Sequence, residues 1–187
     1  MKKLLLLITL AACTTLAKAQ STSYHAFKVD VTFGYAIPQT SGDGVNVKAG
    51  VTFTVEPHYR LSDDLAVGLR MEGAGLGYAN TNDANTSNTN VTVSYSFCPS
   101  VEYYFTQTGF RPFVSAGAGI FTRSALSVNN DTDNATFGAS SSKFGFFPRA
   151  GFEVGHFRMS AEYNILGSNA NYAAFSIGFF LGGGSKK

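Results

Sequence analysis

The sequence predicts an all-β fold, an eight-stranded antiparallel up-and-down transmembrane β-barrel, and two observations carry this prediction. Apolar and polar residues alternate along about eight stretches of the chain, which is the period of a β-strand and not of a helix. Almost no stretch of helical period remains to cover so many apolar strand faces, so hydrocarbon is the simplest solvent for them. Because an open sheet edge cannot satisfy its backbone groups in hydrocarbon, the sheet must close on itself.

The N-terminus has the features of a secretory signal peptide. Lys2 and Lys3 precede a short apolar run, and Ala17-Lys18-Ala19 follows as a cleavage site of the Ala-x-Ala type. We therefore expect residues 1–19 to be removed and residues 20–187 to form one outer-membrane β-barrel domain. The apolar run is shorter than the ~20 residues of a membrane-spanning helix, and no later run reaches even ~18 residues.

Charge and cysteine content argue against several other classes of protein. Three of the 14 basic residues belong to the signal, which leaves 11 against 12 acidic residues and a net charge of −1 for the mature chain. The overall charge of +2 is therefore no indication of nucleic-acid binding. Cys13 lies in the signal. The residues before it also resemble a lipoprotein processing site, so processing at Cys13 is the alternative to cleavage after Ala19. Cys98 is the one cysteine of the mature chain, so no intramolecular disulfide is possible.

The clearest strand is the stretch VTFTVEPHYRL at residues 51–61. Its odd positions are apolar and its even positions are polar, with Glu56, His58 and Arg60 on the polar face. The same alternation gives each of the other expected strands one apolar face and one polar or small face. The eight strands are expected at residues 27–37, 51–61, 65–72, 91–105, 110–121, 144–154, 157–165 and 172–181.

Short turns alternate with mostly long polar loops along the chain. The turns are expected at residues 62–64, 106–109 and 155–156, and the long loops at residues 38–48, 79–90 and 122–143. Residues that pair across a hairpin share a face, so each turn should join two apolar faces. The expected pairs are Leu61 with Leu65, Phe105 with Phe110, and Val154 with Phe157.

Three prolines conflict with the strand pattern. Pro57, Pro99 and Pro148 lie inside expected strands on the apolar face, where proline removes a donor from the ladder. We expect each of them to mark a β-bulge or a local break in pairing, in the half of the barrel near the short turns.

Charged residues of the expected strands gather on the polar, inward face. A charge at the lipid midplane would cost about 2–4 kcal/mol, so this segregation supports the assigned facing. The expected interior network is Lys28, Asp30, Glu56, Arg60, Arg70, Glu72, Glu102, Arg149, Glu153, Arg158 and Glu162. Eight strands enclose room for little more than side chains, and Tyr104, Phe147 and Phe180 also point inward. We expect a structural network that fills the lumen; an ion pathway is the alternative.

The strand pattern resembles the small outer-membrane β-barrel family of the OmpX and OmpA transmembrane-barrel type, over residues 27–181. The best-matching segments are PRAGFEVGHFRMSAEYN and NYAAFSIGFFLGG, whose alternating aromatics look like the C-terminal strand signal read by the barrel-assembly machinery. The Gly/Lys tail and the absence of tryptophan depart from the family pattern. The resemblance implies a cell-envelope protein of the Gram-negative outer membrane, with the N-terminus and the short turns in the periplasm.

The expected function is a structural or surface-interaction role carried by the extracellular loops. A narrow, porin-like passive channel for ions or small solutes is the alternative. The expected surroundings are outer-membrane lipid and, during insertion, the barrel-assembly machinery; the chain should be a monomer without nucleic acid, metal or cofactor. We expect no enzyme, because His25, His58 and His156 lie near strand ends or turns, away from where barrel hydrolases act. A soluble lipocalin-like binder would need the reverse facing, which the inward glutamates oppose.

Overall fold

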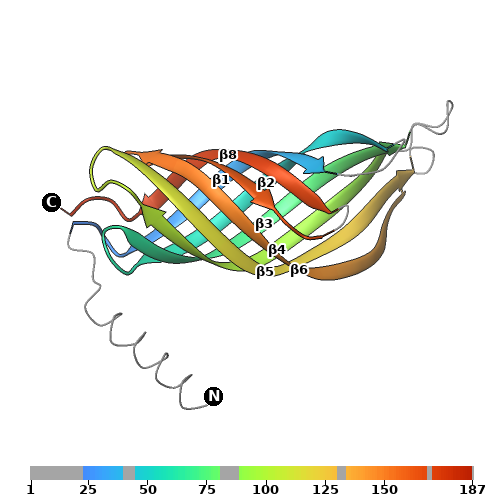
Figure 1. Cartoon of the computed structure of the whole chain (residues 1–187). Helices are drawn as coiled ribbons and strands as arrows, with labels where there is room; N and C mark the ends of the chain where they lie inside the picture. The colour runs from blue at the N-terminus through green and yellow to red at the C-terminus, as the bar shows by residue number, and fades with distance from the viewer. Residues whose placement is uncertain (1–22, 40–44, 81–88, 130–133, 168–169, 187) are drawn as a thin grey trace, which may run out of the picture.

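The structure is a closed antiparallel barrel of eight strands, which confirms the predicted fold class (Figure 1). This computed structural model describes residues 23–39, 45–80, 89–129, 134–167 and 170–186, so the expected signal peptide lies outside the described residues. The strands are β1 (Phe27–Gln39), β2 (Val45–Arg60), β3 (Leu65–Asn80), β4 (Thr89–Tyr104), β5 (Phe110–Asn129), β6 (Asn134–Val154), β7 (Phe157–Asn164) and β8 (Asn171–Gly182). In the part of the chain that is described, no helix is long and apolar enough to cross a membrane.

Strand pairing follows the order of the sequence and closes the ring. Each strand pairs with the next, and β1 pairs with β8 from Lys28 opposite Gly182 to Gln39 opposite Asn171. The C-terminal tail lies at the same end of the barrel as the short turns, on the left in Figure 1. This end is called the short-turn end below, and the opposite one the long-loop end.

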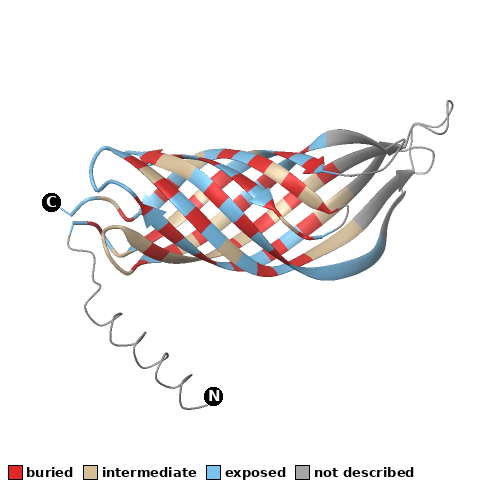
Figure 2. Ribbon diagram, in the orientation of Figure 1, coloured by how far each residue is buried: buried red, intermediate tan, exposed pale blue. Residues whose placement is uncertain are grey.

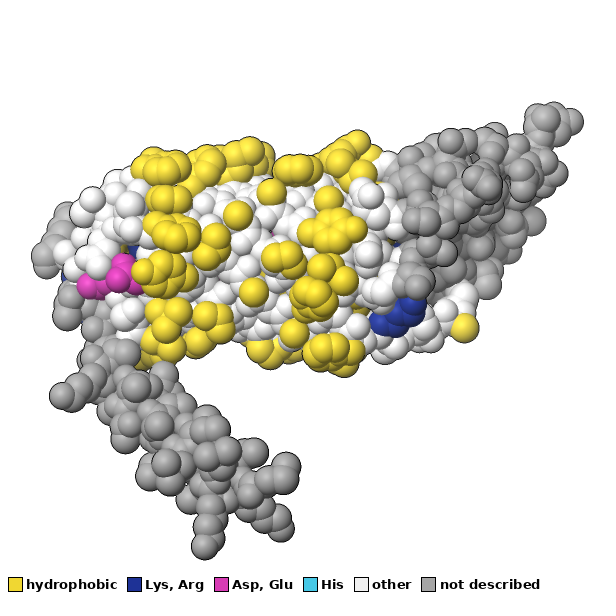
Figure 3. Space-filling view, in the orientation of Figure 1, with side chains coloured by type: hydrophobic (Ala, Val, Ile, Leu, Met, Phe, Trp, Pro, Cys, Tyr) yellow, Lys and Arg dark blue, Asp and Glu magenta, His cyan; other side chains and the backbone are white. Residues whose placement is uncertain are grey.

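Side chains alternate between the interior and the outer surface along the strands (Figure 2). In β7, for example, Phe157, Met159 and Tyr163 are exposed, while Arg158 and Glu162 are buried. On the face seen in Figure 3, the large apolar side chains gather in two bands with smaller side chains between them. The facing predicted from the sequence is therefore confirmed, with apolar residues outward and charged residues inward.

The two outer bands lie about 20 Å apart along the barrel axis, slightly less than the ~25 Å apolar band of an outer-membrane barrel. Phe27 pairs with Tyr59 in one band, and Tyr35 lies in the other, with Val31 opposite Val55 midway between them. At ~3.3 Å per residue and a strand tilt of ~40°, residues 27 to 35 span about 20 Å along the barrel axis. The aromatic side chains of the outer surface are phenylalanine and tyrosine, since the chain has no tryptophan.

The strands extend farther at the long-loop end than the sequence predicts. The prediction of a loop at residues 122–143 is wrong for most of these residues, because β5 continues to Asn129 and β6 starts at Asn134. The expected loops at residues 38–48 and 79–90 likewise lose their ends to β2, β3 and β4. The β5 and β6 extensions lack a sustained alternation of apolar and polar residues in their sequence, yet their backbones still pair. Residues 40–44, 81–88 and 130–133 lie outside the described residues.

Two of the three predicted hairpin pairings are confirmed. Val154 pairs with Phe157 across a turn in which Gly155 has a φ of 60°. The Leu61 N–H donates to the Leu65 carbonyl at 2.8 Å.

The third pairing is wrong by two residues. The Phe105 N–H donates to the carbonyl of Pro112 at 3.0 Å, so Phe105 does not lie opposite Phe110. Side chains hold this wider turn, since the Thr106 hydroxyl donates to the Phe110 carbonyl at 2.6 Å and Arg111 Nε donates to the Thr106 carbonyl at 3.4 Å. A slip of two residues keeps the same face outward, so the facing is unaffected.

Each of the three prolines marks a local break in pairing, as predicted, and none marks a bulge. Pro57 pairs with β1 but not with β3, Pro99 with β3 but not with β5, and Pro148 with β5 but not with β7. The register is the same on both sides of each gap. Because proline lacks an N–H donor, a few backbone pairs are missing beside each proline, and the strands stay in the same register.

Candidate functional site in the barrel interior

The structure places all eleven charged residues of the expected network inside the barrel. Each of them is buried, with at most 8% of its surface exposed. They are Lys28 and Asp30 of β1, Glu56 and Arg60 of β2, Arg70 and Glu72 of β3, Glu102 of β4, Arg149 and Glu153 of β6, and Arg158 and Glu162 of β7.

Two carboxylates organise the cluster nearer the short-turn end. Arg158 donates to both oxygens of Glu102, with Nη1 at 3.0 Å from Oε1, and Lys28 Nζ donates to the same Oε1 at 3.3 Å. The Tyr104 hydroxyl also donates to this oxygen. Glu153 Oε1 accepts from Arg158 Nη1 at 2.6 Å and from Lys28. Four strands are thereby joined through their side chains across the lumen.

A second cluster lies toward the long-loop end. Glu162 joins two arginines, accepting from Arg70 Nη1 at 2.8 Å and from Arg149 Nε at 2.9 Å. Arg149 Nη1 also donates to Glu56 Oε2 at 2.6 Å. Arg70 Nη2 lies 3.5 Å from Glu72 Oε1. These guanidinium groups each contact two carboxylates, as their several donors allow.

His58 connects the two clusters. Its Nε2 lies 3.0 Å from Asp30 Oδ2 and 3.5 Å from Glu56 Oε1. Asp30 in turn lies 3.3 Å from both Lys28 Nζ and Arg158 Nη1. Acidic and basic side chains therefore alternate along the lumen, which specifies the register of the strands more than it adds net stability.

Sequence reasoning missed two members of the network, Arg111 and His58. Arg111 is 4% exposed, and its Nη1 lies 3.7 Å from Glu153 Oε2. Strand parity could have found both, because Arg111 precedes the outward Pro112 and His58 lies on the polar face of its strand. With Arg111 included, the described interior holds six acids and six bases.

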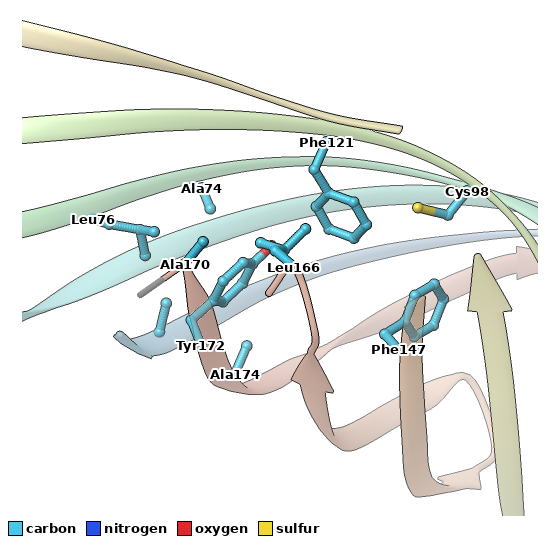
Figure 4. Packing of buried hydrophobic residues seen from close by; sticks show 10 residues of the cluster. Ala74, Leu76, Cys98, Phe121, Phe147, Leu166, Ala170, Tyr172 and Ala174 are labelled. Atoms are coloured by element: carbon cyan, nitrogen blue, oxygen red, sulfur yellow. The ribbon is translucent and has the colours of Figure 1, made fainter. Parts of the chain in front are cut away.

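Apolar side chains close the lumen on the long-loop side of the charges (Figure 4). Leu76, Phe121 and Phe147 are fully buried there. Leu166, from the segment between β7 and β8, joins them with 4% of its surface exposed. The guanidinium carbon of Arg70 lies 3.9 Å from the ring centre of Phe147, so the apolar plug rests directly on the charged cluster.

The geometry among the charges supports neither a metal centre nor a wide passage. An enclosed cavity of about 10 Å³ lies among them, which is room for about one water molecule. Asp30, His58 and Glu102 bring three possible metal-ligand atoms within 4.8 Å of one another. Lys28 and Arg158 already contact both carboxylates, so we assign these three residues to the ion-pair network and not to a metal.

Comparisons with known proteins agree with this architecture. Among solved structures, the chain is similar to the outer membrane protein OprG from Pseudomonas aeruginosa, with a TM-score of 0.53 and 15% identity over 87% of this chain and 98% of that one. It is also similar to Neisserial surface protein A, with a TM-score of 0.50 and 17% identity over 85% of this chain and 98% of that one. These identities show the fold alone, and comparison with curated proteins gives no match.

A family model provides the stronger evidence. The model described as outer membrane protein beta-barrel domain matches residues 5–182, which is most of the chain. This protein therefore belongs to the outer membrane protein beta-barrel domain family and is a protein of the outer membrane.

Proposed function

We propose that this protein is an integral outer-membrane barrel with a side-chain-filled lumen, and that it has a structural or surface-interaction role. The observation that carries the proposal is the packing of the interior. Ion pairs fill the part of the lumen nearer the periplasm, and Leu76, Phe121 and Phe147 fill the part beyond them. Eight strands enclose little more than this volume, so the packing favours a plugged barrel.

The extracellular part of β6 supports a surface role. Residues 138–144 are exposed on both faces of the strand. The partner strand β7 pairs with β6 only from Arg149 to Val154, apart from one isolated bridge between Phe146 and Ile165. Above that bridge, no strand among the described residues pairs with this edge of β6. Unpaired backbone groups on a solvated edge suit the addition of a strand from a binding partner.

A narrow passive channel for ions or small solutes is the second candidate function. The observation that favours it is the water-sized cavity lined by charged side chains, including Asp30, Glu56 and Arg149. Such a cavity is a place where an ion path could begin if the apolar plug moved.

Conductance in planar bilayers separates the two functions. We expect the purified barrel, first shown to be folded by heat-modifiable mobility, to give no stepwise conductance. Stepwise conductance that changes on Arg149→Gln, but not on the matched Lys143→Gln at the exposed rim, would replace the plugged barrel with the channel.

The proposal also names the surroundings of the protein. Outer-membrane lipid contacts the apolar outer face, and the barrel-assembly machinery acts during insertion. The protein works as a monomer, without nucleic acid or cofactor and without catalytic activity. A single detergent-corrected mass of one chain, measured by light scattering, is the expected result for the monomer.

A further inference from the structure

The hydrogen-bonded seam between β1 and β8 continues beyond the barrel wall at the short-turn end (Figure 1). There the segment before β1 pairs with the C-terminal tail. The His25 N–H donates to the Gly184 carbonyl at 3.0 Å. The Lys186 N–H donates to the Ser23 carbonyl at 2.8 Å. We call this pair of segments the terminal ladder, which consists of residues 23–25 and 184–186.

Two glycines bend the tail away from the wall and into the terminal ladder. Gly182 and Gly183 have φ angles of 71° and 61°, a region that residues with a side chain rarely adopt. Before the bend, Lys28 lies opposite Gly182. After it, Tyr24 lies opposite Ser185, which is a shift of one residue in the register. The tail is therefore an ordered part of the barrel, although it departs from the family pattern.

Two short turns fix the terminal ladder at this end of the barrel. The Ser23 N–H donates to Asp63 Oδ1 at 3.1 Å, and the Tyr24 hydroxyl donates to the Gln107 carbonyl. Gln107 Nε2 in turn donates to Asp64 Oδ1 at 3.1 Å, which links the two turns. Tyr24 is therefore held both through the backbone beside it and through its hydroxyl.

The Tyr24 side chain packs into the barrel, against two arginines. Tyr24 is 8% exposed. The guanidinium carbons of Arg60 and Arg111 lie 4.6 Å and 4.1 Å from the centre of its ring. The ring centre of Tyr104 lies 5.5 Å and 4.1 Å from the same two carbons. Each cation therefore contacts two aromatic rings, one from the barrel wall and one from the terminal ladder.

Arg60 depends on these rings more than Arg111 does. Arg60 is fully buried, and none of its three guanidinium nitrogens has a hydrogen-bond partner. Among the described residues it forms one ion pair, with Glu153 Oε2 at 3.9 Å from Nη2. Arg111 instead donates to two backbone carbonyls of the short turns. Because the face of an aromatic ring attracts a desolvated cation, Tyr24 stabilises the buried charge of Arg60.

A cavity of about 230 Å³ lies beside the terminal ladder. Its lining includes Tyr24, Arg111 and Glu153, but not Arg60. Tyr24 therefore lies against both the cavity and Arg60. Removing the Tyr24 ring would extend the cavity to the guanidinium group of Arg60.

We propose that Tyr24 closes the short-turn mouth of the lumen, and that the C-terminal tail holds it in place. The tail supplies the backbone partners of the segment that carries Tyr24, and the Tyr24 ring covers Arg60. This inference rests on the proposed plugged lumen. It adds a second closure, at the end opposite the apolar plug of Leu76, Phe121 and Phe147.

Modification of arginine side chains by methylglyoxal, located by peptide mass spectrometry, tests this closure in the full-length barrel in detergent. Arg60 is the reporter, and Arg70, fully buried in the other cluster, is the internal control. Tyr24→Gly removes the ring, whereas Tyr24→Phe keeps the ring and loses only the hydroxyl. Lys186→Pro removes the N–H that bonds the Ser23 carbonyl, and Lys186→Gln is its matched control.

We expect Arg60 to react roughly tenfold faster, or more, in Tyr24→Gly and in Lys186→Pro than in the wild type. Tyr24→Phe and Lys186→Gln should react at the wild-type rate, and Arg70 should stay protected in every variant. If Lys186→Pro does not give the heat-modifiable form, a chain that ends at Gly182 takes its place.

An unchanged rate at Arg60 in Tyr24→Gly would overturn the proposal. So would a faster rate in Tyr24→Gly alone, because the tail would then not hold the ring. Equal acceleration at Arg70 would show general unfolding and would count against it as well. The plugged lumen is tested separately, since stepwise conductance of the wild type would refute it whatever the rate at Arg60.

Discussion

Replacing Glu102 by glutamine should destabilise the barrel far more than neutralising a carboxylate at its rim. Glu102 is fully buried and accepts hydrogen bonds from Arg158, Lys28 and Tyr104. Glu102→Gln keeps the volume of the side chain but leaves a buried cation without its counter-charge. Removing one partner of a buried ion pair costs about 3–5 kcal/mol. The folded-to-unfolded ratio should therefore fall by roughly 140- to 4,000-fold, at tenfold per 1.4 kcal/mol.

Urea titration in phospholipid vesicles measures this loss. Far-UV circular dichroism and heat-modifiable mobility are suitable signals, since the chain has no tryptophan for fluorescence. The matched control is Asp64→Asn, whose carboxylate accepts an exposed hydrogen bond from Gln107 at 3.1 Å and should contribute less than about 1 kcal/mol. Adding Lys28→Met to Glu102→Gln should recover part of the loss, because it removes one uncompensated charge. A loss for Glu102→Gln no larger than that for Asp64→Asn would refute the reasoning.

Three further substitutions test the outer face, the plug and the closure of the barrel. Val55→Arg, midway between the two bands, should lower the free energy of unfolding in urea titrations by about 2–4 kcal/mol. Tyr59→Arg, in the band itself, should lower it by at most about 1 kcal/mol. Equal losses would contradict the assigned membrane position. Phe147→Ala should cost about 3–5 kcal/mol through the cavity it leaves, and a loss below about 1 kcal/mol would show that the plug is loosely packed. Gly178→Val should abolish the heat-modifiable form, because its Cβ would lie 2.1 Å from the Val31 carbonyl oxygen where β1 pairs with β8. Gly73→Ala should fold normally, because the atom nearest to its added Cβ is 3.8 Å away.

Strand parity explains why so much of the interior was predictable. A period of two assigns every side chain to one face, and a wrong pairing by two residues changes no assignment. Phe105 shows this, since it lies opposite Pro112 and not Phe110 and still faces outward. The same rule places Arg111 and His58 inside, so these two were missed although their signal was present.

Features outside the membrane, or between strands, gave no comparable signal. The parts of β5 and β6 at the long-loop end lack, in their sequence, the sustained alternation that marks the rest of these strands. Leu166 lies in a connection, where no parity rule applies, and yet it completes the apolar plug. The pairing of the tail with Tyr24 and His25 depends on the two glycines that bend it, and the composition of the tail did not predict this pairing.

Relaxation of side-chain methyl signals by a lipid-soluble paramagnetic probe tests most directly which side of the wall meets hydrocarbon. In NMR spectra of the barrel in lipid nanodiscs, the methyl groups of Val31, Val55 and Ile177 should broaden strongly. Those of Leu76 and Leu166, behind the wall, should stay sharp. Broadening of Leu76 and Leu166 with sharp signals from Val31 and Val55 would contradict a barrel that turns its apolar face to lipid and its charges inward.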